Sequence, residues 1–86
     1  MFTPEFISET ERAFVLVANH NLDSDEAVRL SIGYNLSRIA FGLKHAAPRL
    51  ERCRLVYDIR GQMVADEVIR RIHQALDPHC ILEFKR

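Results

Sequence analysis

Three polar residues with chemically useful side chains stand at and just beyond the end of a predicted strand over residues 53–59. They are Asp58, Arg60 and Gln62, and the intervening Gly61 permits a turn with positive φ. A carboxylate and a guanidinium two residues apart at a strand end can project to the same side of a sheet. Asp58 could then act as a base or orient Arg60, and Arg60 could hold a phosphate through its planar fork. An ion pair beside a glycine turn, without any catalysis, explains the same spacing.

His20 is the fourth candidate catalytic residue. It lies between Asn19 and Asn21, directly after the apolar run 13–18. A histidine in such a loop is accessible and titrates near neutral pH, so it could serve as a general acid or base. An ordinary loop histidine with no chemical task fits the same position.

Two patterns suggest metal ligands. Asp58 followed by Glu83 and Lys85 has the spacing of restriction-type nucleases, in which a carboxylate pair holds Mg²⁺. Alternation along a strand places Glu83 and Lys85 on one face, but a whole helix separates them from Asp58 along the chain. We therefore predict no metal site. The sequence does not identify a cofactor, and bound Mg²⁺ is the alternative.

The second pattern combines Cys53 and Cys80 with His45 and His79. Two cysteines and two histidines could bind Zn²⁺, but the short cysteine spacing of compact zinc sites is absent. Free cysteine is commonly a small core residue. The sequence therefore predicts structural cysteines, and neither a zinc site nor a cysteine nucleophile.

The elements that position these residues alternate between apolar strands and helices. The spacing predicts strands over 13–18, 53–59 and 80–84, and helices over 24–47 and 63–76. Helical crossovers join parallel strands, so this order predicts an α/β fold with a small three-stranded parallel sheet, β-α-β-α-β, in a single domain over 1–86. Ligands of such sheets usually bind beyond the carboxyl ends of the strands, where all four candidate catalytic residues should meet. Residues 1–12 are predicted to form a short helix or to lie across the core.

The long helix carries two apolar stripes. The first is the predicted core face and consists of Val28, Ile32, Leu36, Ile39, Leu43 and Ala46. The second, on nearly the opposite side, consists of Leu30, Tyr34 and Phe41. A helix that is apolar on two sides is sandwiched, so either residues 1–12 or another molecule should cover this second stripe.

Composition narrows the classes of partner. The chain has 86 residues with 12 basic and 12 acidic side chains, which give a net charge of zero. Zero net charge argues against broad electrostatic binding to nucleic acid or anionic membranes. No apolar stretch approaches the roughly 20 residues of a membrane span, and the first residues do not resemble a signal peptide. We expect a cytoplasmic protein whose thin core is stabilised by a protein partner or by a homodimer.

The segment from Cys53 to Arg86 resembles a known family. Its apolar strand, Asp58-x-Arg60-Gly61-Gln62 motif, amphipathic helix and closing strand are similar to the C-terminal toxin domains of bacterial contact-dependent growth inhibition and related polymorphic toxins. Many of these domains are nucleases that act on tRNA or other nucleic acid. The resemblance implies a nuclease-like toxin acting on RNA, and it nominates Asp58, Arg60 and Gln62 as site residues.

Two functions therefore stay open. The first is the toxin-like nuclease, with His20 added at the active edge. The second is a non-catalytic interaction or inhibitor protein, of the plasmid- or phage-encoded kind, that binds a protein partner or a second copy through Leu30, Tyr34 and Phe41.

Overall fold

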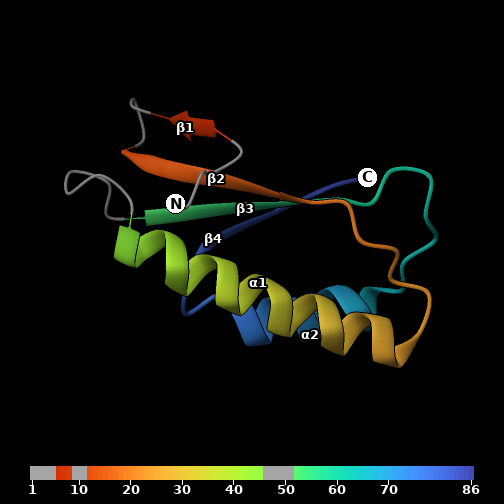
Figure 1. Cartoon of the computed structure of the whole chain (residues 1–86). Helices are drawn as coiled ribbons and strands as arrows, with labels where there is room; N and C mark the ends of the chain where they lie inside the picture. The colour runs from red at the N-terminus through yellow and green to blue at the C-terminus, as the bar shows by residue number, and fades with distance from the viewer. Residues whose placement is uncertain (1–5, 9–11, 46–51) are drawn as a thin grey trace.

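The computed structural model describes residues 6–8, 12–45 and 52–86. The elements along these residues (Figure 1) are β1 Phe6–Ser8, β2 Ala13–Ala18, α1 Asp25–His45, β3 Arg52–Asp58, α2 Asp66–Leu76 and β4 Ile81–Lys85. The sheet has the order β1-β2-β3-β4, with β2, β3 and β4 parallel and β1 antiparallel to β2. The predicted α/β fold with three parallel strands and two crossover helices is confirmed, and β1 adds a fourth strand.

β1 lies in the segment for which the sequence predicts a short helix or a lead-in across the core. Residues 6–8 form an edge strand instead, with Ile7 opposite Phe14 of β2. The strand supplies hydrogen-bond partners to one edge of β2, whose backbone groups would otherwise lack them. Residues 1–5 and 9–11 of the predicted lead-in lie outside the described residues.

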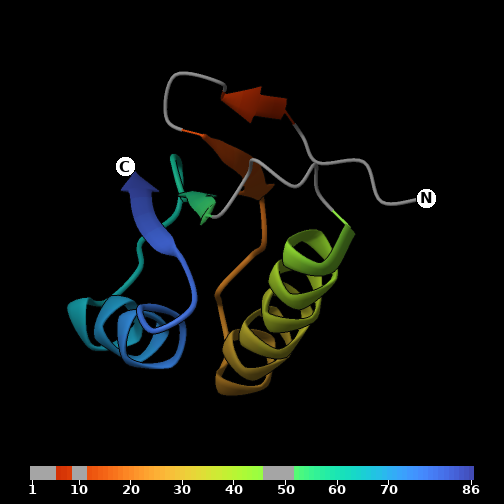
Figure 2. The same cartoon turned by 90° about the vertical axis from the view of Figure 1, so that its left-hand side faces the viewer.

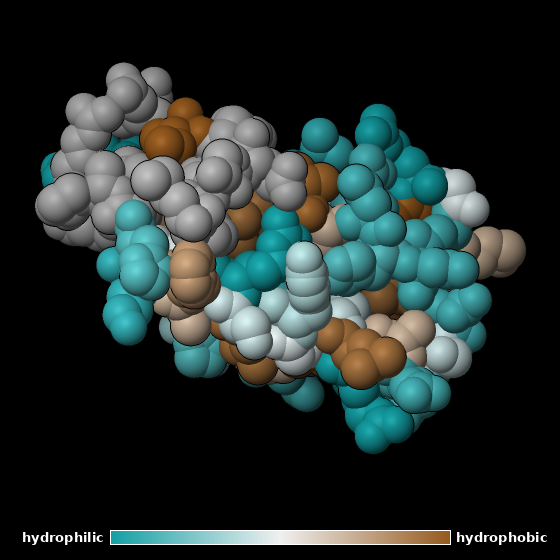
Figure 3. All heavy atoms as spheres, viewed as in Figure 1, coloured by the Kyte–Doolittle hydropathy of each residue, from teal (hydrophilic) through white to brown (hydrophobic). Residues whose placement is uncertain are grey.

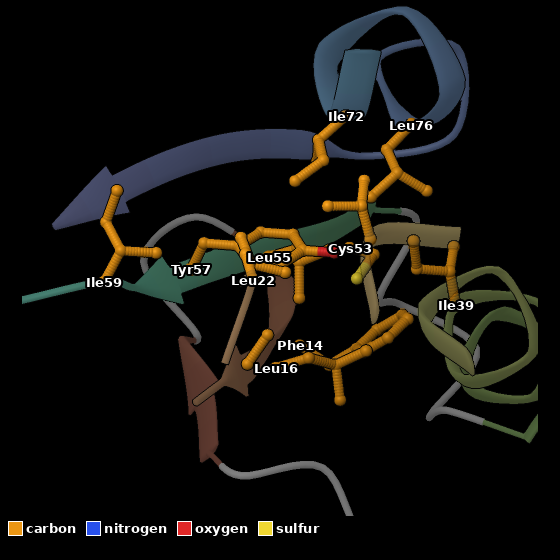
Figure 4. Packing of buried hydrophobic residues seen from close by; sticks show 12 residues of the cluster. Phe14, Leu16, Leu22, Ile39, Cys53, Leu55, Tyr57, Ile59, Ile72 and Leu76 are labelled. Carbon is orange, nitrogen blue, oxygen red and sulfur yellow. The ribbon is translucent and has the colours of Figure 1, made fainter. Parts of the chain in front are cut away.

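Both helices cover the same face of the sheet (Figures 1 and 2). This follows from the strand order, because two successive crossovers of the same hand that step in the same direction place their helices on the same side. The main core lies between this face and the helices (Figure 4), and its strand residues alternate along the chain: Phe14, Leu16 and Ala18 in β2, then Cys53, Leu55 and Tyr57 in β3. The other face also has buried residues, since Val15 is 0% and Val56 5% exposed.

The buried face of α1 differs from the predicted one. Its buried residues are Val28, Ser31, Asn35, Ile39 and Gly42. Ile32 and Leu36 are only partly buried, Leu43 is 43% exposed, and Ala46 lies outside the described residues. The helix is turned toward Ser31 and Asn35 because both bond to the hydroxyl group of Tyr57, which β3 places in the core.

The two helices start in different ways. Ser24 caps α1, since its Oγ accepts a hydrogen bond from the backbone N–H of Ala27 at 3.1 Å. α2 begins at Asp66, later than the predicted residue 63, because Ala65 is still extended at φ −66° and ψ 147°. Residues 63–65 instead bridge from the glycine turn to the helix, with Met63 fully exposed to solvent.

Candidate functional site

Gln62 fixes the loop that follows β2. Its Oε1 accepts a hydrogen bond from the backbone N–H of Leu22 at 2.9 Å, and its Nε2 donates to the carbonyl oxygen of His20 at 2.8 Å. The turn that presents Gln62 has Gly61 at φ 85°, where L side chains are strained. Both polar atoms of the amide therefore bind backbone. This is a positioning role, and the catalytic role of Gln62 stays a prediction.

Asp58 and Arg60 form a bidentate ion pair at the end of β3. Arg60 donates from Nε to Asp58 Oδ1 at 2.8 Å and from Nη2 to Oδ2 at 2.6 Å. The Arg60 side chain is 64% exposed and the Asp58 side chain 20%. The hydrogen bonds from Arg60, assisted by the charge of Lys85, lower the pKa of Asp58 to about 2. A carboxylate held so firmly in its charged form is a weak general base at neutral pH, so the pair mainly orients Arg60.

Asp58, Glu83 and Lys85 share the sheet face that the helices leave uncovered. The register pairs Asp58 with Lys85 and Val56 with Glu83, which confirms that Glu83 and Lys85 project together. Each carboxylate engages an arginine, however: Glu83 pairs with Arg54 as Asp58 pairs with Arg60. Within the described ranges, no three acidic, histidine or cysteine side chains are grouped to hold a metal ion.

His20 belongs to a polar network on the opposite, helix-covered side. Its Nδ1 lies 2.6 Å from Ser31 Oγ, which lies 2.7 Å from the hydroxyl oxygen of Tyr57. Asn35 Nδ2 donates to the same Tyr57 oxygen at 2.9 Å, and Arg38 Nη1 donates to Asn35 Oδ1 at 3.1 Å. Ser31, Asn35 and Tyr57 are all buried. A continuous chain of hydrogen bonds thus leads from the partly exposed His20 into the core.

The donors and acceptors fix the direction of this chain. Arg38 can only donate, so its partner on Asn35 is the oxygen atom, and the Asn35 nitrogen must donate to Tyr57. Among the described residues, Ser31 is the acceptor within reach of the buried Tyr57 hydroxyl proton, so Tyr57 donates to Ser31, and Ser31 in turn donates to His20 Nδ1. The His20 ring is consequently neutral, with its proton on Nε2. Burial, with a further contribution from the charge of Arg38, lowers the pKa of His20.

The predicted catalytic set is therefore divided by the sheet. Tyr57 points to the helices and the next residue, Asp58, to the other face, because consecutive strand residues alternate. His20 contacts Tyr57 and Tyr34 edge-on, on the helix side, with ring centroids 6.2 and 5.5 Å apart. His20 and the Asp58–Arg60 pair thus both follow the carboxyl ends of strands, but they lie on different faces of the sheet.

A hollow of about 420 Å³ opens at the carboxyl edge itself. It is lined by residues 59 and 61–65 and by Arg86. Of the four candidate catalytic side chains, only Gln62 lines it. The hollow is therefore not an active site built from the predicted residues.

The second apolar stripe of α1 is exposed. Leu30 is 66%, Tyr34 53% and Phe41 45% exposed, and Figure 3 shows hydrophobic side chains between polar ones on the side of the molecule that α1 forms. Two open hollows meet at Tyr34. One, of about 440 Å³, is lined by His20, Ala27, Leu30, Ser31 and Tyr34, and the other, of about 420 Å³, by Tyr34, Ser37, Arg38 and Phe41. Arg38, which lines the second hollow, lies over the Tyr34 ring at 5.3 Å and donates to the carbonyl oxygen of Val17.

Both cysteines are structural in their setting. Cys53 is 1% exposed, and burial raises the pKa of its thiol to about 12. Burial likewise raises the pKa of Cys80 to about 11, and its Sγ donates to the carbonyl oxygen of Leu76 at 3.4 Å. Thiols that stay protonated at neutral pH are poor nucleophiles. His45 is placed elsewhere, with its ring 4.2 Å from that of Phe41.

Compared with known proteins, the chain matches no family model, no curated protein and no solved structure. None of the helices in the described part of the chain has the length and apolarity needed to cross a membrane.

The network residues Ser31, Asn35, Tyr57 and Arg38 are not among the predicted site residues. The sequence features that could have predicted the network are the four-residue spacing of Ser31 and Asn35 on α1 and the position of Tyr57 within an apolar strand. Polar residues in such positions are also common on solvated surfaces, so only the packed structure distinguishes a buried polar network from ordinary exposed residues.

Proposed function

We propose that this chain is an interaction protein that binds a protein partner through the stripe formed by Leu30, Tyr34 and Phe41. The observation that carries the proposal is the exposure of these three large side chains, at 66%, 53% and 45%, on one side of a single helix. Aromatic and aliphatic side chains beside open hollows are the usual anchors of protein interfaces. Burying side chains of this kind contributes about 1.5–3 kcal/mol each when burial is complete.

The state of the candidate catalytic groups supports the same proposal. Gln62 is engaged with backbone, Asp58 is neutralised by Arg60, and His20 accepts a hydrogen bond from Ser31 in the deduced chain. These groups stabilise loops and turns within the chain. The large apolar side chains of α1, by contrast, stay 66%, 53% and 45% exposed, and covering their exposed parts would add apolar burial.

The proposal is tested by photo-crosslinking in bacterial cells. A photo-reactive phenylalanine analogue is placed at position 41 or, as a matched control, at position 63, since Met63 is also fully exposed but lies outside α1. We expect covalent protein adducts from position 41 and few from position 63. Equal yields at both positions, or no adduct at position 41, would contradict the proposal.

Nuclease-like activity on RNA is the second candidate, and the exposed Arg60 favours it. Its guanidinium is held by Asp58 in one orientation while the side chain stays 64% exposed, and Lys85 lies opposite Asp58 on the same face. An oriented arginine beside a lysine is a suitable arrangement for contacting a phosphate. The resemblance to polymorphic toxin domains rests on the same Asp58, Arg60 and Gln62.

Inducible expression in bacteria tests this second candidate. Wild type, Asp58→Asn and Arg60→Ala are compared for growth and for intact RNA on a gel, with Arg29→Ala as a control at an exposed arginine elsewhere. The nuclease candidate predicts growth arrest and RNA cleavage by wild type and Arg29→Ala only. Normal growth and intact RNA in all four strains would rule it out as an autonomous activity.

A further inference from the structure

The spacing of small and large residues along the exposed side of α1 follows a helix-packing repeat. Starting from Ala27, the positions alternate by three and four residues: Ala27, Leu30, Tyr34, Ser37, Phe41 and Lys44. This alternation is the seam by which one helix packs along another at a shallow angle. The seam contains three large apolar side chains, Leu30, Tyr34 and Phe41, and two small residues, Ala27 and Ser37, so it offers both knobs and holes.

From this spacing we infer that the partner of the stripe is a second copy of this chain, with the two α1 helices packed antiparallel. The inference rests on the proposed function, because it names the partner of the same surface. A two-fold axis between residues 35 and 36 places Leu30 against the partner's Phe41 and Tyr34 against the partner's Ser37. Two-fold contacts of this kind are the commonest closed assembly of identical chains.

The two hollows fit this register. Phe41 of the partner subunit would enter the hollow of about 440 Å³ beside Ala27, Leu30 and Tyr34. The partner's Leu30 would enter the hollow of about 420 Å³ beside Ser37 and Phe41. Each copy thus supplies both the large side chain and the hollow that receives it, which a two-fold interface requires.

The charges of α1 fit the antiparallel direction. Its first turn carries Asp25 and Glu26, and its last turn carries Lys44 and His45. In the inferred register Glu26 lies against the partner's His45, and Ala27 against the partner's Lys44. The positive end of each helix dipole also meets the negative end of the other. A parallel pair would bring acidic ends together and basic ends together, which costs free energy.

The register is tested by cysteine exchange in the full chain. Ala27→Cys and Lys44→Cys are made separately, purified, mixed and oxidised, and compared with each variant alone. The antiparallel pair predicts a covalent dimer from the mixture only, because the two copies of position 27 would lie about 25 Å apart, far beyond disulfide reach. Wild type is the control for Cys53 and Cys80, whose raised pKa values of about 12 and 11 disfavour oxidation.

Light scattering of the purified chain measures the assembly itself. We expect a concentration-dependent mass approaching twice the 10.0 kDa of one chain, and about tenfold weaker association for Phe41→Ala than for Met63→Ala. Circular dichroism checks that each variant is folded. A monomer at every concentration, or self-linking of each cysteine variant alone, would overturn the antiparallel dimer. If a monomeric chain still forms adducts at position 41 with a different protein, the dimer fails and the proposed binding function stands.

Discussion

At the residue scale, the hydroxyl group of Tyr57 shapes the packing of α1. The side chain is 0% exposed, and its oxygen contacts Ser31 Oγ at 2.7 Å and Asn35 Nδ2 at 2.9 Å. A buried hydroxyl without partners is costly, so the helix buries Ser31 and Asn35 more deeply than the predicted core residues Ile32 and Leu36. The same hydroxyl connects His20, through Ser31, to the core.

Removing this hydroxyl should destabilise the fold. In Tyr57→Phe, the Asn35 amide loses its short hydrogen bond and keeps only the 3.5 Å contact to Ser31, and Ser31 loses a donor, so we expect a loss of about 1–3 kcal/mol in the free energy of unfolding. Urea denaturation measures it. Tyr34→Phe is the matched control, because it removes the hydroxyl of a ring that is 53% exposed. Equal stability of the two variants would show that the network does not stabilise the fold.

The stability of the fold should also depend on the protonation of His20. Burial lowers its pKa in the folded state below the ordinary 6.5, so the unfolded chain binds a proton more readily. The contribution of neutral His20 is therefore complete above about pH 6.5 and is lost as the pH falls through the lowered pKa. Denaturation curves at several pH values between about 7.5 and 5 should show this decline, and His20→Asn should flatten it. An unchanged pH dependence in His20→Asn would contradict the deduced proton arrangement.

At the element scale, two glycines have opposite roles. Gly61 has φ 85° in the turn that presents Gln62, whereas Gly33 lies inside α1, where a β-carbon would meet no neighbouring side chain within 4 Å. Gly61 is required by the backbone, and Gly33 only weakens its helix.

Alanine substitution should therefore shift stability in opposite directions. Gly61→Ala should destabilise by about 1 kcal/mol or more, because the positive φ is strained for any side chain. Gly33→Ala should stabilise by about 0.5–1 kcal/mol, because alanine favours the helix. Thermal unfolding followed by circular dichroism measures both changes. Destabilisation by both substitutions would mean that Gly33 has a packing role in the monomer.

The elements are more predictable from the sequence than the site is. Apolar runs such as 13–18 and the proline- and glycine-bounded helices follow from local pattern, so the predicted β-α-β-α-β order is correct. The pairing of β1 is not predictable, because three residues carry too little periodicity. Nor does the sequence say which strand face the helices cover, so it cannot show that His20 and Asp58 lie on different faces. The polar partners of Tyr57, Ser31 and Asn35, are not predicted because hydrophobic periodicity concerns apolar residues only.

At the scale of the whole molecule, the two faces of the sheet are covered unequally. Both helices cover one face of the sheet (Figure 2), and the main core lies between that face and the helices (Figure 4). α1 buries one side against the sheet and leaves Leu30, Tyr34 and Phe41 about half exposed or more. For so short a chain, covering this side would add apolar burial that the monomer lacks. In the inferred dimer, a second copy supplies that cover.

Sedimentation velocity tests the inferred dimer most directly. Wild type, Met63→Ala and the double variant Tyr34→Ala/Phe41→Ala are compared over a range of concentrations, each checked for its helical content. We expect wild type and Met63→Ala to sediment as dimers at high concentration and the double variant to sediment as a monomer. Identical sedimentation of wild type and the double variant would contradict the dimer.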